Sequence, residues 1–560
     1  MIKRFLILAI LNIVLLHSFG QSYNIILGRP TDISVTASIL FDQKTDMYIE
    51  YGIKSGSYTS STPVVTSVEG QPIVTKISGL TAETRYYYRT RYRKTGASTY
   101  LTGTEHTFVT QRKKGNPFVF TIEADPHPYD PKGYHPLWDI CLSNQLNDGA
   151  DFMFDLGDTF GDDHLDKVTN LTRTSAQVQQ LMLDNRPHLG NVCHSMPFFF
   201  CQGNHEGENG YYLLQTPPEN LATYETLWRK FYYPNPEPDA FYSGNNEEEP
   251  YGMGKPQNYY AFEWGDALFV VVDGWRYYTA NVKPRNWDWT IGKTQYDWLK
   301  TTLENSKAKF KFVFTHHVMG ETRGGIGVAT GFEWGGLDNG SNKFALNRPG
   351  WAMPIHQLMV VNHVNILFQG HDHVYAYENM DKIVYQTVPM PADSSYSLGY
   401  IANGAAFTGT VLKGSGHLRV TVSPDSAKVD FVSALLPEDE TTTSKNGDIL
   451  YSYSIKNTVA NGVETVEFSK IPEVTVFPNP SNGNFYLKKK GEKGIKTLTL
   501  IDLEGRIISK KSINGSINTE ENIPVNFDAN NRNIADGIYC ILITFDDNSS
   551  IRKLLSVCKE

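Results

Sequence analysis

The chain of 560 residues contains little cysteine and no excess of basic side chains. Its five cysteines form neither a CxxC pair nor a regular framework, so disulfides are not expected to hold the fold together. Lys and Arg number 51 against 60 Asp and Glu, and the net charge of −9 gives no indication of nucleic acid or an anionic membrane as a partner. Beyond residue 20, no run approaches the roughly 18 apolar residues of a transmembrane helix, so none is predicted.

The N-terminus has the pattern of an export signal. Residues 1–4 carry positive charge, residues 5–16 are apolar, and Ser18 and Gly20 place small side chains at the −3 and −1 positions. The apolar run of about a dozen residues is too short to span a membrane. We therefore predict a signal peptide over residues 1–20, with cleavage before Gln21.

Residues 21–112 predict a small β-sandwich. Apolar or alternating segments at 33–41, 46–51, 84–92 and 105–110 are separated by turn residues. Within this region, the stretch ISGLTAETRYYYR (residues 77–89) resembles the "GL-x-P-x-T-x-Y-x-Y" corner of fibronectin type III domains, with Ala82 in place of the usual proline. The resemblance implies a fibronectin type III-like domain, in which no residue points to chemistry.

The pattern changes near residue 113. Strand-length apolar runs now alternate with helical segments such as 175–182 and 294–304, which indicates an α/β domain whose sheets are covered on both faces. Later segments at 419–422, 428–432 and 449–455 predict antiparallel strands that complete the domain near residue 456. The predicted fold is an α/β domain over residues 113–456 between two small all-β sandwiches.

A polar linker is predicted at 457–473, and the second sandwich at 474–560. This last segment opens with FPNPSNGNFYL (477–487), continues with DLEGR (502–506) and includes the strand-like GIY (537–539). The three motifs, in this order, resemble the C-terminal sorting domain of the bacterial type IX secretion system. The resemblance implies that the type IX machinery is a partner and that the protein is exported through the periplasm to be secreted or held at the cell surface.

Polar residues follow five of the buried strands of the central domain. The five blocks are Asp125-Pro126-His127, Gly157-Asp158, Gly203-Asn204-His205-Glu206, His316-His317 and Gly370-His371-Asp372-His373. In α/β sheets, ligands bind at the carboxyl ends of the strands. In extended backbone, residues two apart point the same way, so Asp125 and His127 are expected to face one ion. Nitrogen and oxygen ligands without thiolate suit Zn, Mn or Fe.

The order of these blocks resembles the calcineurin-like metallophosphoesterases, the superfamily that includes the purple acid phosphatases. The resemblance implies a β-sandwich flanked by helices and a centre of two metal ions, Fe, Zn or Mn. It assigns one ion to Asp125, His127, Asp158 and His373, with Asp158 bridging to a second ion that Asn204, His316 and His371 complete. His205 matches the catalytic histidine of the family, and Glu206 is expected to orient a neighbouring histidine.

Two further positions bear on this assignment, Gly161 and Arg323. Purple acid phosphatases carry a metal-bound tyrosine three residues after the bridging aspartate, where this chain has Gly161. The centre is therefore expected to lack the purple tyrosinate–iron colour. Arg323, in the glycine-rich loop 320–325, either contacts a substrate phosphate or is a solvated loop arginine.

These features predict a secreted phosphoesterase that hydrolyses small phosphate esters by direct attack of a metal-bound hydroxide. Two divalent ions bring +4 and the carboxylates of Asp125 and Asp158 bring −2, which leaves about +2 for a hydroxide and a phosphate ester. A phosphomonoesterase is the first choice, and a phosphodiesterase or nucleotide hydrolase is the alternative. A non-catalytic surface adhesin with a vestigial metal site is the alternative from a different class. A polymer-binding groove rich in basic and aromatic residues is not apparent, so no nucleic-acid substrate is expected.

Overall fold

A computed structural model of the chain describes residues 22–129, 133–161, 173–278, 283–318, 320, 322–398, 406–456, 473–482, 484–490, 494–502, 507–513, 522–526, 535–546 and 550–558. The predicted signal peptide and nearly all of the predicted linker lie outside these residues. The chain divides into two compact units. One unit contains the N-terminal strands and most of the central strands and helices, and the other contains the C-terminal strands together with the short segment Leu337–Asn342.

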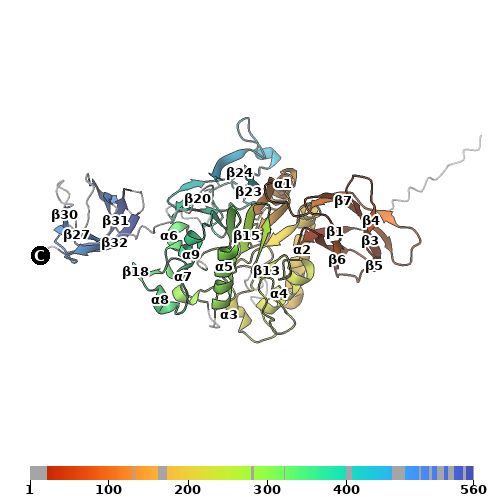
Figure 1. The fold of residues 1–560 in the computed structure, drawn as a ribbon, viewed down its shortest axis with the longest axis horizontal. Helices are drawn as coiled ribbons and strands as arrows, with labels where there is room; N and C mark the ends of the chain where they lie inside the picture. The colour runs from red at the N-terminus through yellow and green to blue at the C-terminus, as the bar shows by residue number, and fades with distance from the viewer. Residues whose placement is uncertain are drawn as a thin grey trace, which may run out of the picture. The chain divides into compact units, whose positions relative to one another are not determined.

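The N-terminal region is an all-β sandwich (Figure 1). One antiparallel sheet contains β1 (Tyr23–Gly28), β2 (Ser34–Phe41) and β6 (Ile73–Ser78). The other contains β3 (Thr45–Gly52), β4 (Ser60–Ser61), β5 (Val65–Thr66), β7 (Arg85–Lys94), β8 (Leu101–Thr102) and β9 (His106–Val109).

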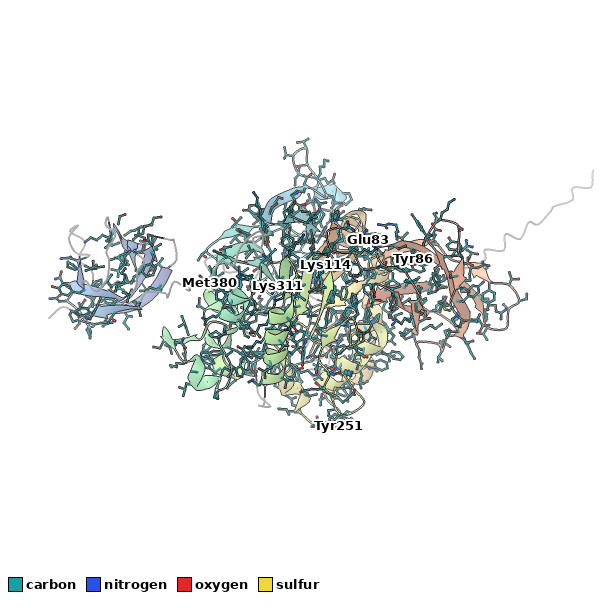
Figure 2. The ribbon with its side chains drawn as sticks, in the orientation of Figure 1. Glu83, Tyr86, Lys114, Tyr251, Lys311 and Met380 are labelled. Atoms are coloured by element: carbon teal, nitrogen blue, oxygen red, sulfur yellow. The ribbon has the colours of Figure 1, made fainter. Side chains whose placement is uncertain are left out.

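Strand β7 explains how this sandwich forms its core. Its side chains alternate, and Tyr86, Tyr88 and Tyr92 point into the core while the arginines between them face outward. Tyr86 is labelled in Figure 2, and its hydroxyl accepts a hydrogen bond from the backbone N–H of Thr81 at 2.9 Å. A tyrosine that bonds the backbone a few residues upstream is the tyrosine corner of immunoglobulin-like sandwiches. This contact supports the fibronectin type III-like prediction.

The central domain is built on two sheets packed face to face. The first sheet has the strand order β12-β11-β10-β23-β24-β25, and the second has the order β13-β14-β15-β16-β19-β21-β20-β22. The strands of the first are β10 (Phe118–Glu123), β11 (Phe152–Asp155), β12 (Phe198–Phe200), β23 (Gly416–Val422), β24 (Ser426–Ser433) and β25 (Ile449–Lys456). Those of the second are β13 (Ser243–Gly244), β14 (Tyr260–Trp264), β15 (Ala267–Val271), β16 (Phe310–Phe314), β19 (Ile366–Gln369), β20 (Tyr375–Met380), β21 (Ile383–Thr387) and β22 (Thr410–Leu412).

A phenylalanine-rich core joins the two sheets. Phe120 and Phe154 from the first sheet pack against Phe269, Phe314 and Phe368 from the second, all at most 1% exposed. The strands β10, β11 and β12 run parallel to one another, as do β15, β16, β19 and β21. Parallel strands end at the same edge of a sheet, and this arrangement positions the residues that follow them.

Helices cover the outer faces of both sheets (Figure 1). Buried side chains of α1 (His135–Asn147), α2 (Ser175–Cys193) and α4 (Leu221–Tyr232) pack with strands of the first sheet, and those of α5 (Lys293–Asn305) and α9 (Ile355–Val361) with strands of the second. Shorter elements are α3 (Gly210–Leu213), α6 (Ile326–Ala329), α7 (Phe332–Gly335), α8 (Phe344–Asn347) and the hairpin β17 (Leu337–Asp338) with β18 (Ser341–Asn342). Two single-turn 3₁₀ helices are η1 (Asn286–Asp288) and η3 (Pro437–Asp439).

Helix α2 is longer than the sequence predicts. It begins at a capping box formed by Thr174 and Gln177 and continues past the predicted end to Cys193, with Pro187 inside it. An interior proline removes one backbone donor and normally ends a helix. Here Leu189 and Val192 are buried against the first sheet, and this packing carries the helix through the proline.

The C-terminal region is a second small sandwich with a core of its own. One sheet contains β26 (Glu473–Phe477), β27 (Asn484–Lys490) and β30 (Asn522–Asn526), and the other β28 (Ile495–Ile501), β29 (Ile507–Ser512), β31 (Gly537–Phe545) and β32 (Ser550–Val557). Phe485, Leu498, Ile541 and Leu555 are at most 1% exposed within it. Most of the DLEGR motif lies outside the described residues.

The predicted fold class, an α/β domain between two all-β sandwiches, is confirmed. The exact domain boundaries remain predictions. Within the part of the chain that is described, no helix combines the length and hydropathy needed to cross a membrane.

Candidate metal centre

Five parallel strands each end close to a predicted site residue. Strands β10, β11 and β12 of the first sheet lead to Asp125, Asp158 and Asn204, and strands β16 and β19 of the second sheet lead to His316 and His371. Because the two sheets pack against each other, loops from both meet at the carboxyl ends of these strands.

One group of donor atoms comprises Asp125, His127, Asp158 and His373, whose atoms lie within 4.8 Å of one another. His127 Nε2 is 3.0 Å from His373 Nε2 and 3.4 Å from Asp158 Oδ2. His373 Nε2 is 3.5 Å from Asp125 Oδ1. All four side chains are at most 9% exposed, so the donors meet in a largely dry pocket.

A second group shares Asp158 with the first and adds His316 and His371. His316 Nε2 is 3.2 Å from Asp158 Oδ2, 3.2 Å from His371 Nδ1 and 3.1 Å from Asn204 Oδ1. The other ring nitrogen of His316, Nδ1, lies 2.8 Å from the Leu156 carbonyl, and this contact fixes the ring so that Nε2 is directed at the group. The structure thus brings all seven predicted metal ligands together.

The donor set fits metal ions. Asp125 Oδ1 and Asp158 Oδ2 are buried and accept no hydrogen bond, although each lies among imidazole nitrogens. A buried carboxylate oxygen without a donor is costly unless a cation faces it. Ligand atoms of a tetrahedral site with metal–nitrogen bonds of about 2.0–2.1 Å lie about 3.3 Å apart. The separations of 3.1 and 3.2 Å around His316 Nε2 match that spacing.

The pKa values of these side chains also indicate a site for positive charge. Burial acts to raise the pKa of Asp158, but the charges of His316 and His205 outweigh it and hold this pKa well below its ordinary value. In Asp125 burial prevails and raises the pKa to about 6. Burial acts to lower the pKa of His316, but the charges of Asp158 and Asp125 raise it to about 9. The two carboxylates therefore draw positive charge to this point.

His371 and His373 are neutral imidazoles at neutral pH. Burial, reinforced by the charges of neighbouring histidines, holds the pKa of both well below the ordinary value. Neutral imidazole is the form that binds a metal ion, so these two side chains need lose no proton on binding.

The backbone at the site is turned, not extended. Asp125, His127, Asp158, His371 and His373 all have positive φ, between 42° and 70°. Asp125 and His127 do share one donor group as predicted, but the assumed reason, extended backbone that points both side chains the same way, is wrong. Non-glycine residues in this left-handed region are strained, and such strain concentrates at functional sites where surrounding contacts impose it.

Hydrogen bonds within the site impose these turns. The N–H of Asp125 donates to the Gly157 carbonyl at 3.0 Å, and the N–H of His127 donates to the Asp158 carbonyl at 3.2 Å. The N–H of His371 donates to Asp125 Oδ2 at 2.7 Å. Loops from three different strands are thus bound to one another by two backbone–backbone hydrogen bonds and one from backbone to the Asp125 carboxylate.

Glu206 fixes two of the loops and does not orient a histidine as the sequence suggests. Its carboxylate accepts hydrogen bonds from the backbone N–H groups of Asp158 at 3.0 Å, Thr159 at 2.7 Å, Phe160 at 3.2 Å and Gly203 at 2.6 Å. The loop that bears the shared aspartate and the loop that bears Asn204 are therefore held by one carboxylate.

Gly161 occupies a position where no side chain fits. A Cβ atom there would lie 1.8 Å from the carbonyl oxygen of His205 and 2.6 Å from the Cα atom of Glu206. The tyrosine that purple acid phosphatases carry at this position would collide with the backbone of the neighbouring loop. The departure seen in the sequence therefore has a steric basis.

His205 lies at the edge of the site. The loop turns at this residue, and its N–H donates to Asp158 Oδ1 at 2.9 Å. The His205 ring lies 5.0 Å from the His127 ring, its Nε2 is 3.9 Å from Asp158 Oδ2, and its side chain is 19% exposed. The turn brings the imidazole to the same side as the two donor groups.

Arg323 contacts one of the turns that carry predicted ligands. Its Nη1 donates to the backbone carbonyl of His371, and Nη1 lies 3.9 Å from Asp372 Oδ1. The guanidinium is 29% exposed. The arginine is therefore anchored beside the second donor group, and contact with a substrate phosphate stays a prediction.

Sequence reasoning missed Trp275. Its ring lies 5.7 Å from the His316 ring and 6.1 Å from the His371 ring, and it is 1% exposed. It covers the second donor group with a buried apolar surface. A signal was available, because Asp273-Gly274-Trp275 follows β15 just as the other polar blocks follow their strands.

Comparisons with known proteins agree with this arrangement. Residues 118–375 match the family model described as Calcineurin-like phosphoesterase, and residues 475–557 match the model described as Secretion system C-terminal sorting domain. A comparison with curated proteins gives no match. The predicted resemblances of the central domain and of the C-terminal segment are confirmed. The sorting domain indicates export through type IX secretion.

Two solved structures share the fold. A purple acid phosphatase from yellow lupin (Lupinus luteus) seeds is 13% identical with a TM-score of 0.52, and the match covers 78% of this chain and 74% of that chain. A protein named PhoD is 14% identical with a TM-score of 0.52, and the match covers 89% of this chain and 94% of that chain. At these identities the similarity is one of fold.

Proposed function

We propose that this metal-dependent phosphoric ester hydrolase, whose residues 118–375 form a calcineurin-like phosphoesterase domain, is an exported phosphomonoesterase with two metal ions. The observation that carries the proposal is the sharing of Asp158 by two adjoining groups of buried donor atoms. Asp125, His127, Asp158 and His373 would hold one ion. Asp158, Asn204, His316 and His371 would hold the other. When bound, such ions supply Lewis acidity and lower the pKa of water near the ester.

The chain's own residues do the remaining work. His205, partly exposed beside Asp158, is placed to give a proton to the oxygen of the leaving alcohol. Arg323 carries a permanent positive charge at the His371 turn and is placed to orient a phosphate oxygen. Trp275 covers one side of the second donor group with a buried ring, which would lower the local dielectric constant around it. Water supplies the attacking oxygen, a P–O bond forms to it, and the P–O bond to the alcohol breaks.

Charge favours a monoester over a diester. Two divalent ions with the carboxylates of Asp125 and Asp158 leave a charge of about +2, because +4 combines with −2, and a hydroxide nucleophile would take up about one unit of it. A phosphate monoester carries up to two negative charges at neutral pH, whereas a diester carries one. Arg323 adds a further positive charge at the edge of the site. The electrostatic attraction of the site is therefore stronger for the doubly charged monoester than for the singly charged diester.

Metal analysis and two chromogenic substrates test the proposal. We expect the purified protein, after repletion with Zn, Mn or Fe, to hold two ions per chain and to be colourless or pale because Gly161 stands in place of the tyrosine. We expect kcat/KM for p-nitrophenyl phosphate to exceed that for bis-p-nitrophenyl phosphate by about tenfold, or about 1.4 kcal/mol. A preference for the diester would overturn the monoesterase assignment. A metal content below one ion per chain would contradict the proposed metal centre. Two bound ions without hydrolysis of either ester would favour the alternative of a non-catalytic surface adhesin.

The C-terminal segment is expected to act in export and not in catalysis. All predicted ligands lie before residue 374, and the C-terminal strands have a core of their own. We expect deletion of residues 474–560 to leave kcat/KM unchanged and to retain the protein in the periplasm, as measured by activity in cell fractions. A purified truncated protein that remains folded but has lost activity would contradict this division of roles.

A further inference from the structure

The N-terminal sandwich is joined to the central domain by a fully buried arginine of α2. Arg186 is 0% exposed. Its Nε donates to Asn24 Oδ1 of β1 at 2.7 Å, and Nη1 and Nη2 donate to Ser38 Oγ and Ser38 O of β2 at 3.2 and 3.0 Å. Nη1 also donates to the Tyr232 carbonyl at the end of α4. One guanidinium thus binds the N-terminal sheet, α2 and α4 together.

Such an arrangement is costly, because the hydrogen-bond partners of Arg186 are neutral oxygens. A buried charge needs either an opposite charge or a full set of hydrogen bonds. Burial lowers the pKa of Arg186 to about 10, while the nearby Tyr233 ring favours the charged form. An apolar side chain would fill the same space without this cost. The directional bonds therefore point to a role in alignment.

The neighbouring residue on α2 reaches the metal centre. Asn185 Nδ2 donates to the Thr159 carbonyl at 2.7 Å, and both residues are 0% exposed. Thr159 directly follows Asp158, the aspartate shared by both donor groups. The Thr159 hydroxyl is itself bound to Asp155 at 2.8 Å. Asn185 thus holds the side of the turn that Glu206 does not reach.

Contacts at the C-terminal end of α2 hold the helix against the same sandwich (Figure 1). The Tyr88 hydroxyl donates to the His194 carbonyl at 2.6 Å, and the rings of His106 and His194 stack at 3.9 Å. At Gly190, a Cβ atom would lie 2.8 Å from the Cβ atom of Asn24, so the helix and β1 approach as closely as the backbone allows. The C-terminal half of α2 is therefore fixed in position against the sandwich.

We infer that Arg186 is a positioning residue of the metal centre: it aligns α2 on the N-terminal sandwich, and α2 through Asn185 orients the turn that carries Asp158. The N-terminal sandwich is then part of the scaffold of the site and not a spacer. The inference rests on the proposed role of Asp158 as the shared metal ligand.

Metal affinity tests this role in the full chain. We expect Arg186→Met, which keeps the length of the stem, to weaken Mn²⁺ binding about tenfold and to lower kcat with little change in KM. Asn185→Ala is expected to have the same two effects while leaving the contact between the domains intact. Because both act through one turn, their effects in the double variant should be less than additive. Arg186→Lys should restore part of the affinity.

Gln111→Met serves as the matched control. Gln111 Nε2 donates to the Glu263 carbonyl of β14 at 2.9 Å, a bond that also joins the N-terminal sandwich to the central domain but does not involve α2. We expect this variant to bind Mn²⁺ as the wild type does. Affinity is measured by titration at a temperature where circular dichroism shows each variant folded.

Wild-type Mn²⁺ affinity and kcat in folded Arg186→Met would overturn the inference and leave Arg186 a structural residue. If that variant does not fold, Asn185→Ala decides, because wild-type affinity in it would equally overturn the inference. Failure of the proposed function would look different. The wild-type protein would then bind metal without hydrolysing a monoester, and the affinities of the variants would still report on alignment.

Discussion

Replacing Asp158 with alanine is expected to remove both metal ions at once and to lower kcat/KM by about 10⁴-fold or more, or at least about 5.5 kcal/mol. Asp158 is the residue common to both donor groups, and its Oδ2 lies 3.4 Å from His127 Nε2 and 3.2 Å from His316 Nε2. Without this carboxylate neither group keeps its full set of donors. The measurement is metal content by elemental analysis after repletion, together with steady-state kinetics.

Two variants serve as controls for this result. Asp125→Ala removes a donor from the first group only, so it should keep the ion of the second group. Asp148→Asn changes a carboxylate that bonds His417 and Arg419 of the first sheet, outside both donor groups, and should keep both ions. Retention of two ions by Asp158→Ala would show that this residue does not bridge them.

Replacing His205 with alanine is expected to keep both ions and to lower kcat by about 10²–10⁴ on an alkyl phosphate, the usual contribution of general acid catalysis. The alkoxide that leaves from such a substrate needs a proton, and a histidine side chain can exchange one in the neutral pH range. p-Nitrophenolate leaves without a proton, so the loss on p-nitrophenyl phosphate should be much smaller. His205 is suited to this role because it is partly exposed and lies 3.9 Å from Asp158 Oδ2.

The comparison of the two substrates distinguishes a general-acid role of His205 from a purely structural role in its loop. His205→Gln, which keeps a polar side chain of similar reach but cannot act as an acid near neutral pH, should behave like the alanine variant. Equal losses on both substrates, or loss of metal from either variant, would mean that His205 only stabilises the loop through its contacts with Asp158.

The identity of the candidate ligands was predictable because strand ends are visible in the sequence. Each of the five apolar runs is followed within a few residues by Asp, Asn or His, and parallel strands bring such residues to one edge. The same reasoning was not applied to the residues that follow β15, and Trp275 was therefore missed. Asn185 carried no signal, because a single asparagine in a helix is usually a surface residue.

Backbone direction was not predictable from the same pattern. Five of the candidate ligands lie in turns with positive φ, where the rule for extended strands does not apply. These conformations are imposed by hydrogen bonds between loops that are far apart in the chain, such as Asp125 to Gly157 and Glu206 to Asp158. The orientation of His205 depends on these long-range bonds as well.

The amino-acid sequence by itself determined the fold class, the order of the three regions and the kinds of side chain at the metal centre, because these follow from local periodicity and from motifs of adjacent residues. Only the tertiary structure decided that one aspartate is shared by two donor groups, that no side chain fits at Gly161, and that Arg186 ties α2 to the N-terminal sandwich. Each of these depends on distances between residues dozens to hundreds of positions apart. Such distances are set by the packing of whole sheets and helices, and no local pattern contains them.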